Sequence, residues 1–104
     1  MIWRVELLPE VEEDVAEAAA WYDDRQAGLG AEFIEEVVCV WDALVENPLL
    51  NSRRHPVKNI RWRYPARFPY RIIFEVIAKE RLVVVAAVLH AARHDREWRR
   101  RVVK

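Results

Sequence analysis

The sequence predicts an α+β domain in which a two-helix hairpin packs on a four-stranded, mainly antiparallel sheet. Three observations predict this fold. Apolar side chains recur at helical spacing through residues 9–46, strand-like patterns fill residues 60–90, and 104 residues form one domain, 1–104. The expected order is strand, helix, helix, three strands and a short C-terminal helix.

The first residues alternate between apolar and charged side chains. Trp3, Val5 and Leu7 are separated by Arg4 and Glu6, which is the period of a half-buried strand. We therefore expect a strand at the N-terminus.

Two amphipathic helices are expected next. Pro9 suits the first turn of a helix that ends near Arg25. Gly28 and Gly30 bracket a tight turn, and the second helix then continues to Asn47-Pro48. Two helices joined by so few residues form an antiparallel hairpin.

The second half of the chain predicts three strands and a short helix. Residues 60–64 and 68–77 alternate in polarity, and residues 81–90 are apolar on both faces, as in a central strand. Residues 51–56 are expected to form a basic loop, and Asp95 to cap the last helix. The hairpin has apolar surface for only one face of the sheet, so we expect another protein to cover part of the opposite face.

The zero net charge conceals a strong segregation of charge. Residues 1–50 carry two arginines and 13 acidic residues, whereas residues 51–104 carry 15 basic and four acidic residues. This division predicts one acidic and one basic surface, and the basic one suits nucleic acid, a ribosome or an acidic protein. The alternative is that the two halves neutralise each other within the fold.

Arginines dominate the candidate binding residues, because guanidinium groups bind phosphate and carboxylate oxygens in a bidentate way. By strand alternation, four of them are expected to share one sheet face: Arg61, Arg63, Arg67 and Arg71. A second group follows the last strand: Arg93, Arg96, Arg99, Arg100 and Arg101. Aromatic side chains interleave with them, which suits single-stranded nucleic acid, although Trp62 and Tyr70 are expected to face away from the arginines.

Three histidines are candidate acid–base groups, because only histidine titrates near neutrality without perturbation. His90 ends the last strand, His94 follows it, and His55 is expected to have a structural role. No carboxylate or thiolate is suitably placed beside them, so no metal site is expected. With two glycines in the whole chain there is no glycine-rich phosphate loop, so no nucleotide cofactor is expected either.

The remaining features point to an ordinary soluble protein. Cys39 is the single cysteine, cannot form an intrachain disulfide, and is expected in the core of the second helix. The longest apolar run, Leu82 to Leu89, has eight residues, against about 18 for a membrane span. The N-terminus does not look like a signal peptide. We therefore expect a cytoplasmic protein without a membrane partner.

Several segments, in this order, resemble the RelE/ParE superfamily of type II toxin–antitoxin toxins, and the resemblance covers nearly the whole chain. They are the Ala27-Gly28-Leu29-Gly30 turn before Phe33, Glu46-Asn47-Pro48, Phe68-Pro69-Tyr70-Arg71-Ile72-Ile73-Phe74 and Val88-Leu89-His90-Ala91-Ala92-Arg93. The resemblance implies a bacterial growth-arresting toxin, neutralised by a cognate antitoxin that covers its basic and apolar surface. It allows a homodimer or a toxin–antitoxin heterotetramer.

The superfamily resemblance implies two alternative mechanisms. RelE-like toxins cut mRNA on the ribosome without a metal, using basic side chains and a group that moves a proton. ParE-like toxins bind and poison DNA gyrase without chemistry of their own. On the ribonuclease alternative, Arg61, Arg63, Arg71 and Arg93 match or lie near the basic catalytic residues, and His90 is the candidate that moves the proton.

The position nearest the catalytic tyrosine of RelE is Trp98, whose indole has no ionisable proton at a useful pH. This departure favours the gyrase inhibitor, with candidate binding residues Arg67, His94, Arg96, Trp98, Arg99 and Arg100. His94 is also an alternative to His90 for the proton if the chain is a ribonuclease. A third hypothesis is a degenerate toxin that only binds its antitoxin.

Overall fold

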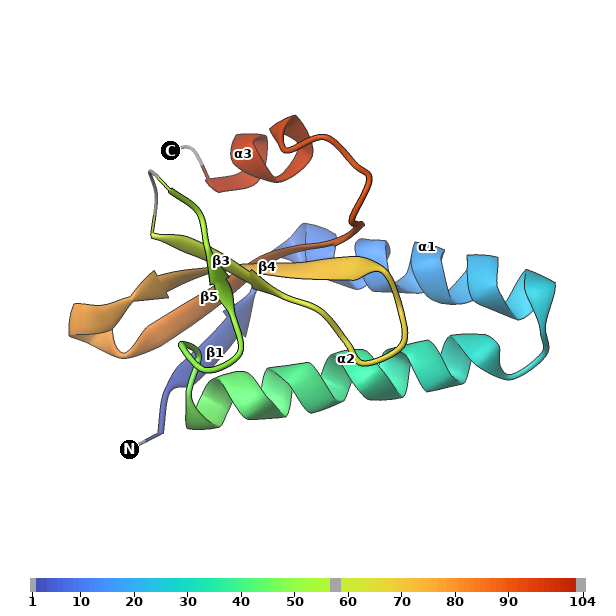
Figure 1. Cartoon of the computed structure of the whole chain (residues 1–104), viewed down its shortest axis with the longest axis horizontal. Coiled ribbons are helices and arrows are strands. Elements are labelled where there is room, and N and C mark those ends of the chain that lie inside the picture. The colour runs from blue at the N-terminus through green and yellow to red at the C-terminus, as the bar shows by residue number, and fades with distance from the viewer. Residues whose placement is uncertain (1, 57–58, 103–104) are drawn as a thin grey trace.

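The computed structural model describes residues 2–56 and 59–102 and confirms the predicted α+β class (Figure 1). In chain order the elements are β1 (Arg4–Leu7), α1 (Pro9–Arg25), α2 (Leu29–Glu46), β2 (Arg53–Arg54), β3 (Ile60–Arg63), β4 (Tyr70–Ile77), the 3₁₀ turn η1 (Ala78–Glu80), β5 (Leu82–His90) and α3 (Arg96–Val102). Within the described residues, no helix is both long and apolar enough to cross a membrane.

The sheet has five strands in the order β1-β5-β4-β3-β2, one more than the sequence predicted. The additional strand is β2, whose residues Arg53 and Arg54 pair antiparallel with β3 in a stretch expected to be a loop. A two-residue strand is too short to show any periodicity. β1 is parallel to β5, and the other three pairings are antiparallel.

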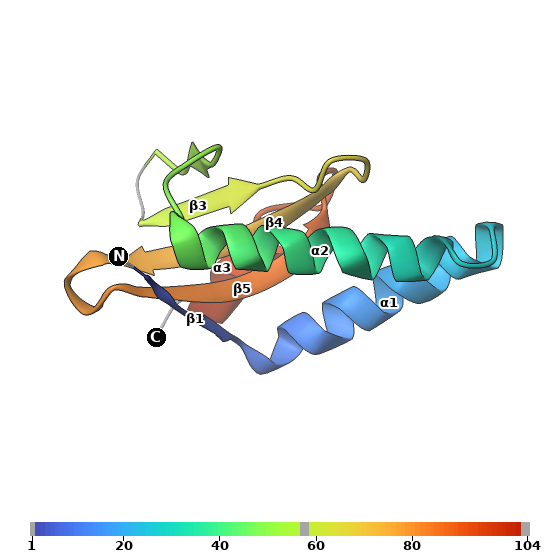
Figure 2. The ribbon, with the colours of Figure 1, turned by 90° about the horizontal axis from the view of Figure 1, so that it is seen from below.

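The helices lie on both faces of the sheet. α1 and α2 run side by side across one face, and α3 lies against the opposite face (Figures 1 and 2). The larger core packs Phe33, Val37 and Leu44 of α2 against strand residues including Ile72 and Phe74. The smaller core forms around Trp98 of α3. The chain therefore covers with its own C-terminal helix part of the face expected to need another protein.

A β-bulge changes which residues of β5 face the hairpin and which face α3. Ile73 of β4 pairs with Ala87, but the next residue, Phe74, pairs with Val85, so Ala86 is the extra residue. Before the bulge Val83 and Val85 face the hairpin, and after it Val88 does, while Ala87 and Leu89 face α3. A bulge reverses the alternation of side chains at one point.

The hairpin turn depends on its two glycines. Gly28 has a φ of 89°, in the left-handed region that glycine adopts without a steric cost. A Cβ atom at Gly30 would lie 2.4 Å from the carbonyl oxygen of Ala19, so only glycine permits this approach of α1 and α2. The Gly30 N–H also donates to Asp23 Oδ1 at 2.8 Å.

Cys39 is exposed, so the expectation that it lies in the core is wrong. The buried seam of α2 runs through Phe33, Val37, Val40 and Leu44. Cys39 precedes Val40 by one residue, which is about 100° around a helix, and this rotation turns its thiol away from the sheet.

An ion pair between α1 and α3 connects the two layers across the edge of the sheet. Arg101 donates to both carboxylate oxygens of Asp14, at 2.6 and 3.0 Å. Asp14 also accepts the N–H of Val88, and Arg101 donates to the carbonyl oxygen of Ala86. The strand β1 pairs with β5 only as far as Val85. The Asp14 and Arg101 side chains therefore bond to the backbone groups of Val88 and Ala86, which β1 does not reach.

We predict that Asp14→Asn lowers the free energy of unfolding by about 3 kcal/mol, because it leaves a mostly buried Arg101 without its anion. Urea denaturation followed by circular dichroism measures the change. Glu12→Gln, an exposed substitution on the same helix, is the matched control and should change the value by less than about 0.5 kcal/mol. Equal stability of the two variants would contradict a structural role for the pair.

Candidate functional site

The predicted arginines do not share one face of the sheet. Arg61 and Arg63 pair with Phe74 and Ile72, which belong to the core under the hairpin. Directly paired residues point to the same side, so both arginines lie on the hairpin side. Arg71, next to Ile72 on β4, points to the opposite side, toward α3. The prediction that the four arginines share one face is wrong. Alternation within a single strand does not show which face of β3 coincides with which face of β4, and only the register of the pair decides this.

The three arginines on or near the hairpin side have local partners or neighbours. Arg61 donates to the Ser52 hydroxyl at 3.1 Å, and Arg63 lies at a shallow hollow beside α2. Arg67 binds two carboxylates of α2, with Nε 2.5 Å from Glu36 and Nη2 2.9 Å from Glu32. Arg67 therefore holds the loop between β3 and β4 against α2.

Arg71 is buried, with only 7% of its surface exposed. Its guanidinium lies 3.0 Å from Asp95 Oδ1, donates to the carbonyl oxygen of Arg93 at 3.1 Å, and sits 5.5 Å from the centre of the Trp62 ring. These contacts attach the segment between β5 and α3 to the sheet. Arg71 thus serves the packing of α3 and does not project from the surface.

Asp95 is the counterion at this junction. Burial alone would raise the pKa of Asp95, but its hydrogen bond and charge interaction with Arg71 hold that pKa below its ordinary value. Arg99, one turn further along α3, lies 4.0 Å from the other carboxylate oxygen. The carboxylate therefore stays ionised at neutral pH and joins β4 to the start of α3.

Trp98 and His55 fill the space between α3 and the sheet. Trp98 is fully buried, with its ring 5.4 Å from that of His55. The Nε2 atom of His55 lies 3.2 Å from Nη2 of Arg99. Trp98, predicted as a binding residue, is thus a core side chain, whereas the structural role predicted for His55 agrees with its burial.

The exposed basic side chains lie around α3. We call Arg93, His94, Arg96, Arg99 and Arg100 the C-terminal basic surface, and all five are exposed. Glu97 pairs with two of them, at 3.4 Å from Arg93 and 3.1 Å from Arg100. The surface keeps an excess of positive charge, and its guanidinium groups remain accessible to an anionic partner.

The two exposed histidines shape the turn before α3. The Nδ1 atom of His90 accepts the N–H of Ala92 at 3.0 Å, and Nδ1 of His94 accepts the N–H of Arg96 at 3.1 Å. His90 also lies against the ring of Tyr70, with ring centres 5.4 Å apart. No group of three potential metal ligands occurs among the residues that the structure describes.

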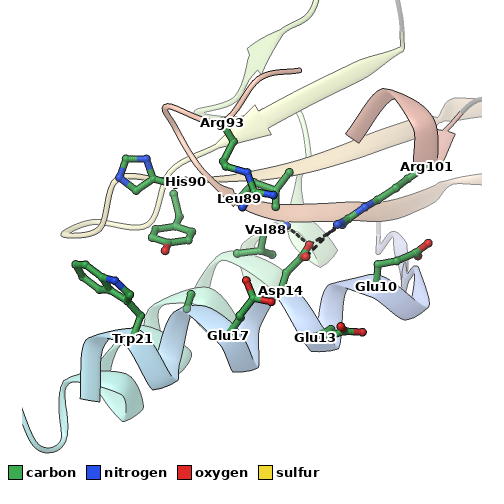
Figure 3. A pocket seen from close by; sticks show the side chains of 12 residues that line it. Glu10, Glu13, Asp14, Glu17, Trp21, Val88, Leu89, His90, Arg93 and Arg101 are labelled. Carbon is green, nitrogen blue, oxygen red and sulfur yellow. Dashed lines mark hydrogen bonds and ion pairs between the residues drawn. The ribbon is translucent and has the colours of Figure 1, made fainter. Parts of the chain in front are cut away.

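The predicted catalytic set is therefore divided among three places. Arg61 and Arg63 lie on the hairpin side, and Arg71 is buried on the other. His90 and Arg93 line a groove between α1 and β5 (Figure 3). This arrangement offers permanent charges for binding, and it does not direct these five side chains at a common point.

The sequence did not identify Asp95 and Asp14 as the ion-pair partners of Arg71 and Arg101. Asp95 was expected only as a helix cap, although its position four residues before Arg99 is a local signal of an ion pair. Asp14 and Arg101 are 87 residues apart and carry no local signal of their contact.

Comparisons with known proteins agree with this architecture. Residues 5–95 match the family described as ParE toxin of type II toxin-antitoxin system, parDE. A solved chain of the chromosomal ParDE system from P. aeruginosa superposes with a TM-score of 0.73 at 12% identity, covering 86% of this chain and 96% of that one. No curated protein matches the chain.

Two further solved structures share the fold. One is the RelBE2 toxin–antitoxin complex from Mycobacterium tuberculosis, with a TM-score of 0.58, 16% identity, and 86% of this chain and 99% of that chain covered. The other is a doubly substituted E. coli toxin RelE in the free state, with a TM-score of 0.64, 14% identity, and 99% and 100% covered.

The matched family and the shared fold thus place the chain in the RelE/ParE class of small toxins. Within it, the chain belongs to the ParE toxin family of type II toxin–antitoxin systems, because that family matches most of its length.

We predict that the Asp95–Arg71 pair makes stability sensitive to acid. Because the pKa of Asp95 is lowered in the folded state, its contribution is full above the unfolded pKa of about 3.9 and is lost as pH falls through the folded pKa. The wild type should therefore lose stability more steeply below about pH 4 than Asp95→Asn. Urea denaturation from pH 6 to pH 2 measures both slopes, and parallel curves would refute the prediction.

Proposed function

We propose that this toxin arrests growth by binding DNA gyrase and not by cleaving mRNA. The observation that supports this choice is the position of Arg71, buried and paired with Asp95 at 3.0 Å. A group that stabilises a reacting phosphate must reach it, and here the guanidinium would first have to leave its counterion. Arg61 and Arg63 lie on the opposite face of the sheet and cannot join it.

The absence of an acid–base group at residue 98 supports the same choice. Trp98 is buried, and its indole cannot exchange a proton at a useful pH. The exposed histidines His90 and His94 each have Nδ1 bonded to a backbone N–H.

The C-terminal basic surface is the proposed contact with gyrase. The side chain of Arg100 is 74% exposed and that of Arg99 is 50% exposed, so both are available to acidic groups of another protein. Arginine suits such an interface because its planar guanidinium binds carboxylates in a bidentate way.

We further infer a cognate antitoxin as the physiological partner. The chain belongs to a family of type II toxin–antitoxin toxins, and two of the solved structures with this fold come from such systems. Exposed apolar side chains on α2, including Ile34 and Val38, provide surface for it to cover.

Purified toxin should inhibit supercoiling by DNA gyrase and should leave mRNA intact in a ribosome cleavage assay. Arg96→Ala combined with Arg100→Ala should raise the half-inhibitory concentration about tenfold, because two exposed charges leave the interface. Arg4→Ala is the matched control: it removes an exposed arginine from β1, distant from α3, and should inhibit like the wild type.

The outcomes separate the alternatives. Cleavage of mRNA by the wild type, lost in Arg93→Ala, would overturn the proposal in favour of the ribonuclease. If the protein neither inhibits gyrase nor cleaves mRNA, and cells that express it alone still grow, the remaining hypothesis is a degenerate toxin that only binds its antitoxin. In cells, early loss of DNA synthesis before protein synthesis is the expected result.

A further inference from the structure

A groove with a volume of about 290 Å³ lies between α1 and the outer edge of β5 (Figure 3). Val88 and Leu89 of β5 line it on one side, and Glu17 and Trp21 of α1 line it on the other. In Figure 3 both α1 side chains project toward the strand, opposite His90 and Arg93. We call this the acidic groove.

The α1 wall of the acidic groove carries four carboxylates within about two helical turns: Glu10, Glu13, Asp14 and Glu17. Two cations also line the groove: Arg101 pairs with Asp14, and Arg93 lies 3.4 Å from Glu97 outside it, so four carboxylates face two arginines. Among the described residues, no cation lies within ion-pair distance of Glu10, Glu13 or Glu17. The groove therefore has a surplus of negative charge.

Aromatic rings complete one end of the acidic groove. Trp21, Tyr70 and His90 line it together, and the same three rings continue into a neighbouring, mainly apolar hollow with Tyr22 and Pro69. Trp21 is 49% exposed, and the guanidinium of Arg25 already lies over its ring, 3.5 Å from the centroid. This contact is an example within the chain of a cation bound to Trp21, as expected for an electron-rich indole.

Carboxylates beside exposed aromatic rings are complementary to a cation on an apolar stem, such as the side chain of arginine or lysine. A phosphate would instead meet the carboxylates of α1, so the groove disfavours nucleic acid. An open groove on the surface suits an extended segment of another chain, with one side chain inserted between Glu17 and Trp21.

We propose that the acidic groove binds an arginine or lysine side chain from an extended basic segment of the antitoxin. That the partner is the antitoxin rests on the proposed function, whereas the chemistry of the side chain rests on the groove. The groove shares Arg93 with the C-terminal basic surface, but its lining does not include Arg96 or Arg100, on which the gyrase test depends.

The peptide acetyl-Ala-Arg-Ala-amide is the probe, and acetyl-Ala-citrulline-Ala-amide is its neutral counterpart of nearly the same shape. We expect the arginine peptide to shift the indole N–H signal of Trp21, assigned by its loss in Trp21→Phe, in a titration followed by NMR. The citrulline peptide should bind about fivefold more weakly, which is the effect of one exposed charge pair.

Glu17→Gln should weaken binding of the arginine peptide about fivefold, and Trp21→Ala should weaken it further. Glu35→Gln removes an exposed carboxylate from α2 and is the matched control, with binding unchanged. Equal affinity for both peptides, or equal binding by Glu17→Gln and the wild type, would overturn the proposal.

Two further outcomes would assign the groove to another occupant. Shifts of the Trp21 signal with protein concentration alone, lost in Glu17→Gln, would identify a second copy of this chain. Shifts produced by oligouridylate and by neither peptide would identify nucleic acid. Glu17→Gln should inhibit gyrase as the wild type does, so a negative peptide result and a negative gyrase result remain distinguishable.

Discussion

The ion pair between Asp14 and Arg101 is the interaction on which the arrangement of layers depends. It joins the first helix to the last across the edge of β5, and the same two side chains bond to Val88 and Ala86 of that strand. β1 stops at Leu7, so without them this part of the edge would have no intramolecular partner. The pair also forms one wall of the acidic groove and helps to fix α3, which carries the basic surface.

Two kinds of arginine lie around α3, and they differ in their surroundings. Arg71 and Arg101 are mostly buried, each beside one aspartate, and they hold α3 in place. Those of the C-terminal basic surface are exposed and leave charge for a partner. This division follows from solvation, because a buried guanidinium is tolerated only with an anion and further hydrogen bonds, whereas an exposed one needs neither.

The segregated charges partly neutralise each other within the fold and partly form separate surfaces, so both interpretations apply. Cross-half pairs do form, as Arg67 with Glu36 and Arg101 with Asp14 show. They use only a fraction of the charges, so the rest form separate acidic and basic surfaces. A partner that covers both surfaces must therefore carry a basic segment for the acidic groove on α1 and acidic groups for the basic residues on α3.

The sequence by itself determined the hairpin, four of the five strands in their order along the chain and the positions of the basic residues. These follow from local periodicity and from turn residues such as Gly28 and Pro48, whose effects extend over a few residues. Only the tertiary structure decided which face each arginine takes, because the pairing of β3 with β4 and the bulge at Ala86 depend on contacts between distant strands. For the same reason, burial of Trp98 and the contact of Asp14 with Arg101 became visible only once α3 was placed on the sheet.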